Sequence, residues 1–570
     1  MAAVSLSGAP VFAENASKPG QLIEERPTLR RLGVRWRIAG DDNTNARVEV
    51  FFRKAGAGDW QRGLDLFRTT SGWKPDKAPG AGESLFAGSV FHLAENTEYE
   101  LRLSLIDPDG GSTERLLRMR TRPEPRLETP GRVLHVVPGS GGGSGSEADP
   151  FQGLEAADRS ARPGDLFLVH QGSYPAPWRA LTNGAEGSPI VWRGAGDGEA
   201  AIDGGEAGAE QGIVAIGLQD VWLEGLSVCH VRWAIVAHES VRLVVSGCKT
   251  RLTEYGFVAT RCSAKSPCLD LYLADNDMVG PSVWPRSKGI EAARGIQVAG
   301  LGHVVCYNHI RGFADGIDTF DAAECSAIDI YGNDLEAMTD DGVECDYSQH
   351  NVCCFENRLT NVYQGVSAQP VHGGPVYIFR NVLRNVAMET FKLHNGPSGG
   401  LLFHNTSVKA GMPLLLYSNA AVENFVSRNN IFVGGEANYA FESMAPMARC
   451  DFDCDGFGGQ WKTFLKWNGV RYATMEDAAA RAGVYRRAVR LDPERLFAAG
   501  DMRPQDIRTE AAPETTDCRL AEGAAAIDAG ERLFNINDDF TGRAPDLGAR
   551  EFGREAPQYG PRTARPARGV

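Results

Sequence analysis

Carboxylates, one lysine and one histidine recur at matching places in five short segments between residues 293 and 395. The segments read ARGIQVA, ADGIDTFD, DDGVECD, YQGVSAQ and METFKLHN. Polar and apolar residues alternate in each, which predicts five strands with one buried face. Aligned by that alternation, Ile296, Ile317, Val343, Val366 and Phe391 point inward. The outward columns then hold Gln297, Asp318, Glu344, Ser367 and Lys392 in the middle, Arg294, Asp315, Asp341, Gln364 and Glu389 on one side, and Phe320, Asp346, Gln369 and His394 on the other.

Asparagines follow strand-like runs at a nearly constant interval through the same region. Asn308, Asn333, Asn357, Asn381 and Asn405 are spaced by 25, 24, 24 and 24 residues, and an aromatic residue or cysteine lies two places before each. Stacked coils of a solenoid bring equivalent positions to about 4.8 Å, so like side chains form ladders. The 3.6-residue periodicity of helical repeats is missing. The pattern predicts an all-β fold, a right-handed parallel β-helix with coils of about 24 residues.

The same stacking places carboxylates opposite one another. Asp315 should face Asp341, and Asp318 should face Glu344, on neighbouring coils about 4.8 Å apart. Like charges directly opposite destabilise a sheet, so a cation, a shared proton or a cationic substrate must compensate. The alternative is a solvated polar face, although surface charge normally mixes both signs. The columns therefore predict a chemically active groove.

One chemistry that fits this groove is metal-assisted β-elimination. Asp315, Asp340, Asp341 and Glu344 could supply the oxygen ligands that Ca²⁺ prefers. The ion would neutralise a uronate carboxylate and make the adjacent ring proton more acidic. Lys392 could remove that proton, with its pKa lowered by the nearby cation.

The same residues carry a family resemblance. Ala314-Asp315-Gly316, Thr339-Asp340-Asp341-Gly342 with Glu344, and Phe391-Lys392-Leu393 resemble the signature of the family-9 polysaccharide lyases, over about 80 residues. That family contains β-helix pectate and rhamnogalacturonan lyases with an aspartate-held Ca²⁺ and a lysine base. The resemblance implies that the four acids bind Ca²⁺ and that Lys392 is the base. Glu344 stands where the family has Asp, and the distance to Lys392 is one coil longer.

A second chemistry is glycoside hydrolysis by a carboxylate pair. The Asp-Gly-Ile-Asp, Asp-Asp-Gly and His372-Gly-Gly segments resemble parts of the polygalacturonase-type hydrolases of the same fold, without their full motif set. Carboxylates on adjacent coils lie near the separation of retaining glycosidases, and those two coils apart near the inverting range. A third possibility is a glycan-binding β-helix that cuts nothing. Stacking aromatics would favour a binder, but Phe320 is the single aromatic in these outward columns.

Each polar residue of the groove has an expected role. We expect Lys392, His394 and His372 to be catalytic, with His394 beside Lys392 and His372 on a loop above the groove. The expected metal ligands are Asp315, Asp340, Asp341 and Glu344, with Ca²⁺ as the cofactor. The expected substrate-binding residues are Arg294, Asp318, Asp346, Gln364, Gln369 and Glu389.

Composition excludes other classes of function. The net charge of −14 and pI near 5.4 argue against a nucleic-acid partner. The sequence contains no run of about 18 apolar residues, so it predicts no membrane-spanning helix. Twelve cysteines and a small, weakly apolar start suggest a secreted or periplasmic protein, which we expect to be a monomer acting on a polysaccharide. Cys262/Cys268 and Cys450/Cys454 are candidate short disulfides, and no cysteine has the spacing of a structural zinc site.

The chain divides into six stretches. Residues 1–24 are a possible signal remnant or disordered start, 123–132 a linker, 451–552 a closing region and 553–570 a disordered tail. Residues 25–122 alternate in short runs and resemble a fibronectin type III module, with Trp36 in an early strand and Tyr99 as the corner tyrosine. Residues 133–450 form the β-helix, with a short amphipathic capping helix before a strand at Asp165–Val169.

Overall fold

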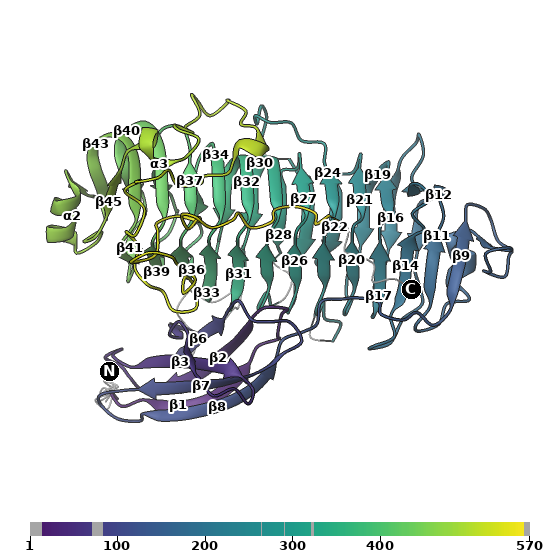
Figure 1. Ribbon diagram of the computed structural model, residues 1–570, viewed down its shortest axis with the longest axis horizontal. Helices are drawn as coiled ribbons and strands as arrows, with labels where there is room; N and C mark the ends of the chain where they lie inside the picture. The colour runs from purple at the N-terminus through teal and green to yellow at the C-terminus, as the bar shows by residue number, and fades with distance from the viewer. Residues whose placement is uncertain (1–13, 71–83, 264, 290, 321–323, 564–570) are drawn as a thin grey trace, which may run out of the picture.

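The computed structural model describes residues 14–70, 84–263, 265–289, 291–320 and 324–563. A small antiparallel β-sandwich comes first in the chain and lies along the side of a long parallel β-solenoid (Figure 1). The predicted all-β parallel helix is confirmed. Among the described residues, no helix is long and apolar enough to cross a membrane.

The sandwich packs two four-stranded sheets around Trp36, which is fully buried. The predicted corner forms, because the hydroxyl of Tyr99 accepts a hydrogen bond from the backbone N–H of Ala94 at 2.9 Å. The strand order is β1 (Lys18–Glu24), β2 (Leu32–Ala39), β6 (Ser84–Val90), β5 (Phe67–Thr70) in one sheet and β4 (Gln61–Arg62), β3 (Arg47–Lys54), β7 (Glu98–Ile106), β8 (Thr113–Arg120) in the other. Strand β1 pairs with β2, so residues 18–24 are not a disordered start; residues 1–13 lie outside the described residues.

Three strands make up each coil of the solenoid, and they stack into two long sheets. The first sheet runs β10 (Phe151–Gln152), β9 (Val133–Val137), β11 (Leu166–Val169), β14 (Ile190–Gly194), β17 (Val221–Glu224), β20 (Val244–Ser246), β23 (Tyr272–Ala274), β26 (Val304–Cys306), β29 (Asp329–Tyr331), β31 (Val352–Phe355), β33 (His372–Phe379), β36 (Ser398–Phe403), β39 (Val422–Arg428), with β41 (Met447–Ala448) and β42 (Asp451–Phe452) beside it. We call it the sandwich-side sheet.

The second sheet contains the other two strands of every coil. Its first run is β12 (Gly172–Pro175), β15 (Ala200–Asp203), β18 (Ser227–Cys229), β21 (Lys249–Arg251), β24 (Asp277–Val279), β27 (His309–Arg311), β34 (Val382–Val386), β37 (Thr406–Val408) and β45 (Val489–Leu491), whereas β44 (Val470–Tyr472) pairs antiparallel with Leu465–Trp467. Its second run, the groove run, is β13 (Trp178–Arg179), β16 (Ala209–Val214), β19 (Val231–Val236), β22 (Tyr255–Ala259), β25 (Arg294–Val298), β28 (Asp315–Thr319), β35 (Phe391–Lys392) and β38 (Leu414–Leu416). Four long strands pass through both runs: β30 (Asp334–Glu344), β32 (Arg358–Ser367), β40 (Ile431–Ser443) and β43 (Gly456–Trp467).

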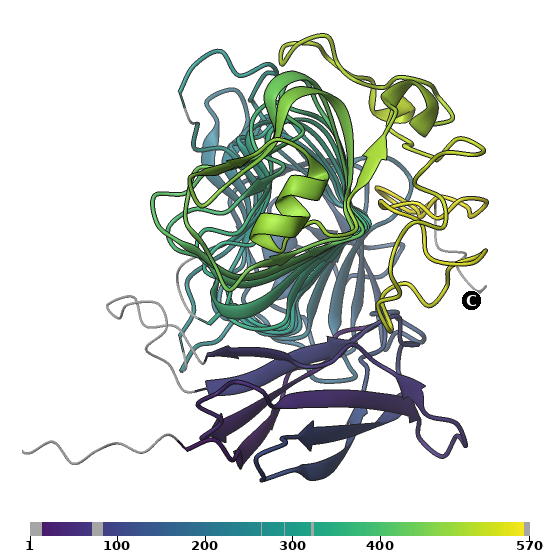
Figure 2. The ribbon, with the colours of Figure 1, turned by 90° about the vertical axis from the view of Figure 1, so that its left-hand side faces the viewer.

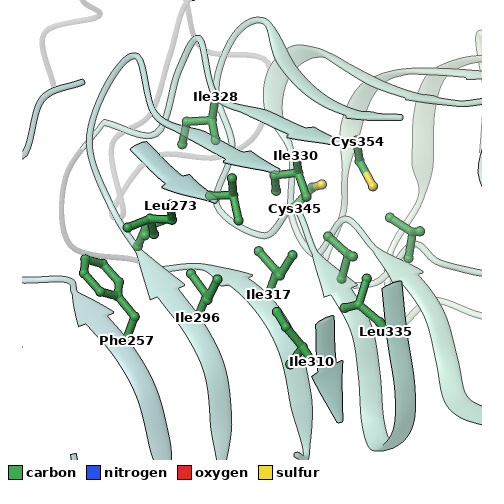
Figure 3. Packing of buried hydrophobic residues seen from close by; sticks show 14 of the residues in the cluster. Phe257, Leu273, Ile296, Ile310, Ile317, Ile328, Ile330, Leu335, Cys345 and Cys354 are labelled. Atoms are coloured by element: carbon green, nitrogen blue, oxygen red, sulfur yellow. The ribbon is translucent and has the colours of Figure 1, made fainter. Parts of the chain in front are cut away.

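Aliphatic, aromatic and cysteine side chains from successive coils fill the interior of the solenoid (Figure 3). Both ends of this core are covered. The predicted capping helix α1 (Leu154–Asp158) buries Leu154 and Ala157 at the first coil. Helix α2 (Met475–Ala482) lies across the other end (Figure 2), where Ala478 and Tyr485 join the core. The remaining short elements are α3 (Pro493–Leu496) and the 3₁₀ turn η1 (Pro513–Thr515).

The predicted asparagine ladder is confirmed and is longer than the sequence repeat indicated. The side-chain oxygen of each asparagine accepts two hydrogen bonds from the preceding asparagine of the ladder, one from its side-chain N–H₂ and one from its backbone N–H, at 2.8–3.1 Å. The line starts at Asn276 and passes through Asn430 to Asp455, whose carboxylate accepts both N–H groups of Asn430. Burial raises the pKa of Asp455 to about 7. Each coil is therefore bonded to the next through a fully buried polar line.

The aromatic ladder is also confirmed, but it faces outward from the sandwich-side sheet. Tyr331, Phe355 and Phe379 stack with ring centroids 5.0 and 4.9 Å apart. The sandwich covers them: Phe91 meets Phe379 edge-on at 5.3 Å. Beside this contact Arg31 of the sandwich forms a fully buried ion pair with Asp329 at 2.6 Å. The sandwich therefore completes a hydrophobic cluster that the solenoid alone would expose to water.

Other expectations need correction beyond the central coils. Parallel pairing continues past residue 450, since β43 pairs with β40 and β45 pairs with β43. Residues 553–563 are not a disordered tail but run back along the solenoid, where Arg562 binds Asp275 at 2.6 Å; residues 564–570 lie outside the described residues. The twelve cysteines are all free. The thiols of Cys450 and Cys454 hydrogen-bond different backbone carbonyls, and those of Cys262 and Cys268 hydrogen-bond each other.

Candidate active site

The predicted columns stand in register on the groove run. Gln297, Asp318, Glu344, Ser367 and Lys392 are successive partners across β25, β28, β30, β32 and β35. The inward line from Ile296 to Phe391 is likewise as expected. Simple two-residue alternation in a solvent-facing strand fixes this register, because a slip by one residue would bury every charged side chain.

Two carboxylates form the buried floor of the groove, and each has a cationic partner. Asp315 and Asp341 are 1% and 0% exposed. Arg294 Nε lies 2.6 Å from Asp315, and Lys392 Nζ lies 2.5 Å from Asp341. The backbone N–H of Asp341 also donates to Asp315 at 2.9 Å. Much of the compensation for the opposed carboxylates therefore comes from the chain itself.

A second carboxyl pair lies beside the floor. Asp318 and Glu344 are register partners that share a hydrogen bond, and Gln297 donates to Asp318 at 2.5 Å. Glu344 is also 3.9 Å from Lys392 Nζ. Two carboxyl groups can share a hydrogen bond when one of them carries the proton. This pair therefore supplies a candidate acid next to the floor.

Burial raises the pKa of four carboxyl groups in and beside the groove. Burial raises the pKa of Asp318 to about 6, against the opposing effects of Gln297 and Arg294. Burial and the charge of Asp318 raise the pKa of Glu344 well above its usual range. The pKa values of Asp315 and Asp346 are raised in the same way, first by burial. These four carboxyl groups thus hold a proton more tightly than they would in water.

Lys392 behaves in the opposite way to the expected base. Burial lowers the pKa of Lys392, but the carboxylates of Asp341 and Asp346 outweigh burial and raise the pKa above its usual value. The side chain is an ammonium group in this arrangement. It reaches diagonally to Asp341 rather than straight along its own column to Glu344, which the sequence could not predict.

A loop that sequence reasoning did not connect to the groove adds a further cation. Residues 280–289 and 291–293 lead from β24 to β25, and Arg286 of this loop lies 3.3 Å from Asp340. The guanidinium also stacks 4.3 Å from the ring centroid of Tyr363. Trp284 of the same loop packs on Ala337 and Ala387. The loop therefore forms a wall of the groove.

Three of the four predicted metal ligands come together. Carboxylate oxygens of Asp315, Asp340 and Asp341 all lie within 4.8 Å of one another, and within the described residues this group does not include Glu344. Asp341 Oδ1 is buried without a hydrogen-bond partner in the described part of the chain, whereas Asp315 Oδ2 lies 2.6 Å from Arg294 Nε. A cluster of hard oxygen donors fits a divalent cation such as Ca²⁺. These three residues would hold it.

Another polar group occupies the neighbouring coil. Glu389 is buried and accepts from the backbone N–H of Tyr417 at 2.7 Å, and His394 Nε2 lies 2.9 Å from its carboxylate. Gln364 accepts the backbone N–H of Glu389 at 2.8 Å. The ring of His394 meets that of Tyr417 edge-on at 5.0 Å. His394 and the half-exposed Tyr417 are therefore available to a ligand, while Glu389 and Gln364 hold them in place.

The remaining predicted residues separate into two places. Asp346 is buried below the groove, where its carboxylate accepts from Ser367 and from the backbone N–H of Gln369, both at 2.7 Å. His372 starts β33 on the sandwich-side sheet, and its backbone N–H donates to Ser348. It thus belongs to a different sheet from Lys392. Burial lowers the pKa of His372 to about 4, so the ring is neutral at pH 7.

Two aromatic residues extend the groove and were missed. Trp233, Tyr255, Arg294 and Asp315 are successive register partners across β19, β22, β25 and β28. The Trp233 and Tyr255 rings meet edge-on at 5.8 Å, and both side chains are partly exposed. The alternation in VRWAIVA and EYGFVA could have located them, since it matches that of the acidic segments.

Comparison with known proteins gives few matches. No family model matches the chain, and no curated protein matches it. The solved structure of XylC in complex with xylose matches 53% of this chain and 76% of that chain, with 12% identity and a TM-score of 0.38. An alginate lyase from Paenibacillus sp. str. FPU-7 matches over 56% of this chain and 95% of that chain, with 14% identity and a TM-score of 0.27. Likeness at this level carries no argument about the reaction.

Proposed function

We propose that this chain is a carbohydrate-active enzyme that hydrolyses an acidic polysaccharide in the groove over β25, β28, β30 and β35. The observation that carries the proposal is the cluster of carboxyl groups on β28 and β30, in which a buried ion-paired floor lies beneath two more accessible acids of β30. Side chains of Glu344 and Asp340 are 13% and 11% exposed, against 0% and 1% for Asp341 and Asp315. Glu344 and Asp340 are therefore the acids that a sugar chain can reach.

The geometry suggests a division of labour between these two acids. Glu344 shares a hydrogen bond with Asp318 and has a raised pKa, which favours it as the proton donor to the leaving oxygen. Asp340, four residues earlier on the same strand, lies beside Arg286 and supplies the second carboxylate. Lys392 and Arg294 neutralise the floor and keep Asp341 and Asp315 in place. The partly exposed Trp233 and Tyr255 provide surfaces on which sugar rings can stack.

Metal-assisted β-elimination is the second candidate, and the Asp315–Asp340–Asp341 group favours it. Bound Ca²⁺ would neutralise a uronate carboxylate and make the ring proton beside it more acidic. Lys392 would remove that proton, which requires a neutral amine. In the structure Lys392 is ion-paired with Asp341, so a cation held by Asp315, Asp340 and Asp341 would have to neutralise that carboxylate before Lys392 could act as a base.

The products of polyuronate digestion separate these reactions. Hydrolysis releases reducing ends without the far-UV absorbance of an unsaturated sugar, whereas elimination produces both, and a glycan-binding protein produces neither. We expect reducing ends alone, with turnover unaffected by chelator. Chelator-sensitive formation of the unsaturated product would replace our proposal with the lyase.

Variants then test the assigned acids. Glu344→Gln and Asp340→Asn should each lower kcat by about 10²–10⁴-fold. Glu336→Gln is the matched control, because Glu336 lies on the same strand β30 but in the first run, where it faces Arg311 instead of the groove. It should keep most of the activity. Equal losses in Glu336→Gln and Glu344→Gln would show that the effect is structural.

We also propose that the N-terminal sandwich is fibronectin type III-like and serves mainly to cover the aromatic ladder. The Tyr99 corner bond and the buried Trp36 support the first part. The Phe91 contacts and the Arg31–Asp329 ion pair support the second, since they fix the module against the solenoid instead of leaving it as a spacer. A chain without residues 1–124 should expose the ladder and aggregate, and a soluble monomer would contradict this role.

A further inference from the structure

A mixed cluster of metal-ligand side chains lies outside the groove, near the first coils. Asp203 ends β15, Cys229 ends β18, and His230 follows Cys229 directly. Asp203 and Cys229 are register partners in adjacent coils, and both point outward and are partly exposed. We call these three residues the Asp203 cluster. Both strands belong to the first run of the second sheet, whereas the groove acids lie on the groove run.

The side chains of the Asp203 cluster already converge. A carboxylate oxygen, the thiol sulfur and a ring nitrogen all lie within 4.8 Å of one another. His230 Nδ1 is 2.8 Å from an Asp203 oxygen, which also accepts the backbone N–H of Gly205 at 2.8 Å. His230 has a φ of 52°, and this left-handed turn brings its ring back to Asp203. Two backbone features thus hold the cluster in shape.

The chemistry of the donors selects a borderline-soft dication. A carboxylate and a thiolate carry two negative charges and the imidazole is neutral, which balances one divalent ion. Thiolate and imidazole ligands favour Zn²⁺ and related transition metals over Ca²⁺ and Mg²⁺. The neighbouring cation, Arg251, does not take this place, because it is 3.7 Å from Glu199 and 3.9 Å from Asp277.

A nucleophilic cysteine is the other chemistry that these residue types suggest, and the contacts disfavour it. A cysteine nucleophile needs its thiol hydrogen-bonded to the imidazole, with the carboxylate behind the ring. Here the thiol of Cys229 hydrogen-bonds Asp203, and His230 is bonded to the same carboxylate. All three groups meet at one point rather than in a relay, which is the arrangement of ligands around an ion.

We propose that Asp203, Cys229 and His230 form a Zn²⁺ site that links two adjacent coils. Three protein ligands leave at least one coordination position for water or an external ligand. The site is independent of the proposed polysaccharide cleavage. Local cysteine spacing in the sequence gives no zinc motif, because the ligands are brought together by stacking across coils.

The test uses the full-length chain, free of any affinity tag and stripped of metal, titrated with Co²⁺ as a spectroscopic substitute for Zn²⁺. Thiolate coordination to Co²⁺ gives a near-UV charge-transfer band that oxygen ligands do not give, so Co²⁺ bound at Asp315, Asp340 and Asp341 stays silent. One equivalent of Co²⁺ should produce the band, and Zn²⁺ should abolish it. Absence of a saturable band would overturn the proposal.

Variants assign the band to these residues. Cys229→Ser should abolish it, and Asp203→Asn or His230→Ala should weaken Zn²⁺ binding by more than the roughly 10–100-fold that loss of a second-shell partner costs. Cys450→Ser, which removes another partly exposed thiol, should change neither the band nor the affinity. All four variants alter partly exposed side chains and should fold, as far-UV circular dichroism will show. A band that persists in folded Cys229→Ser, or is lost in Cys450→Ser, would refute the assignment.

Discussion

Replacing Lys392 by methionine distinguishes a structural cation from a catalytic base. The Lys392 ammonium is 2.5 Å from Asp341, which is 0% exposed, so the variant leaves a buried carboxylate without its partner. Breaking a buried ion pair on one side costs about 3–5 kcal/mol. We therefore expect the free energy of unfolding of Lys392→Met to fall by that amount in urea denaturation.

Two further variants serve as controls for the loss of stability in Lys392→Met. Lys466→Met breaks an ion pair with Glu442 on the same sheet, but Lys466 is 28% exposed, so the expected loss is below about 1 kcal/mol. The double variant Lys392→Met/Asp341→Asn leaves no unpaired charge and should recover much of the lost stability. It also keeps the comparison measurable if Lys392→Met alone does not fold.

The second measurement on these variants is turnover on the polysaccharide. A base would lose about 10²–10⁴-fold in kcat with the unfolding free energy nearly unchanged. An ion-paired lysine loses stability first, and activity falls only as far as Asp341 and Asp340 are displaced. Full stability in Lys392→Met together with abolished turnover would refute our interpretation and establish Lys392 as the base.

Three further outcomes follow from the structure. Burial raises the folded pKa of Asp318 to about 6, so its contribution to stability is present at low pH and is lost as pH rises from about 4 to 6. The unfolding free energy of Asp318→Asn should therefore rise by about 3 kcal/mol relative to that of the unaltered chain across this window. A difference that stays constant with pH would contradict the assignment. Trp233→Ala should raise KM about tenfold with kcat unchanged, as expected for the loss of one stacking contact, while Trp461→Ala on the distant β43 should not. Asn357→Ala removes a ladder member and leaves buried donors unpaired, so the unfolding free energy should fall by about 3 kcal/mol or more, against little change for the exposed Asn419→Ala.

The sequence was sufficient for the parts of the molecule that depend on short periods. Alternation placed Ile296 through Phe391 inward and Gln297 through Lys392 outward, and the 24-residue interval located the asparagine and aromatic ladders. Both patterns are local or strictly periodic, and neither requires knowledge of distant contacts. The candidate groove could be found for the same reason.

Features that depend on the length of a side chain or on contacts between distant segments could not be predicted in this way. Lys392 crosses two coils to Asp341, because a four-carbon side chain can choose among several acids at similar distance. Arg286 arrives from a loop without periodicity. The outward direction of the aromatic ladder becomes understandable only when Phe91 of the sandwich is seen against it. The position of Arg562 likewise depends on its partner Asp275, 287 residues earlier in the chain.

The direction of the asparagine ladder constrains how this protein can change in length. Every asparagine side chain of the ladder both donates and accepts hydrogen bonds. A coil that carries one can therefore be inserted or removed between two others without leaving a polar group unsatisfied. Asp455 has no side-chain N–H₂ group with which to continue the line, and its carboxyl oxygens accept from Asn430 and Ser427. The ladder of side-chain hydrogen bonds therefore ends at Asp455. Duplication of internal coils is thus compatible with the fold, whereas extending the amide ladder itself beyond Asp455 would require a side chain with an N–H₂ group at that position.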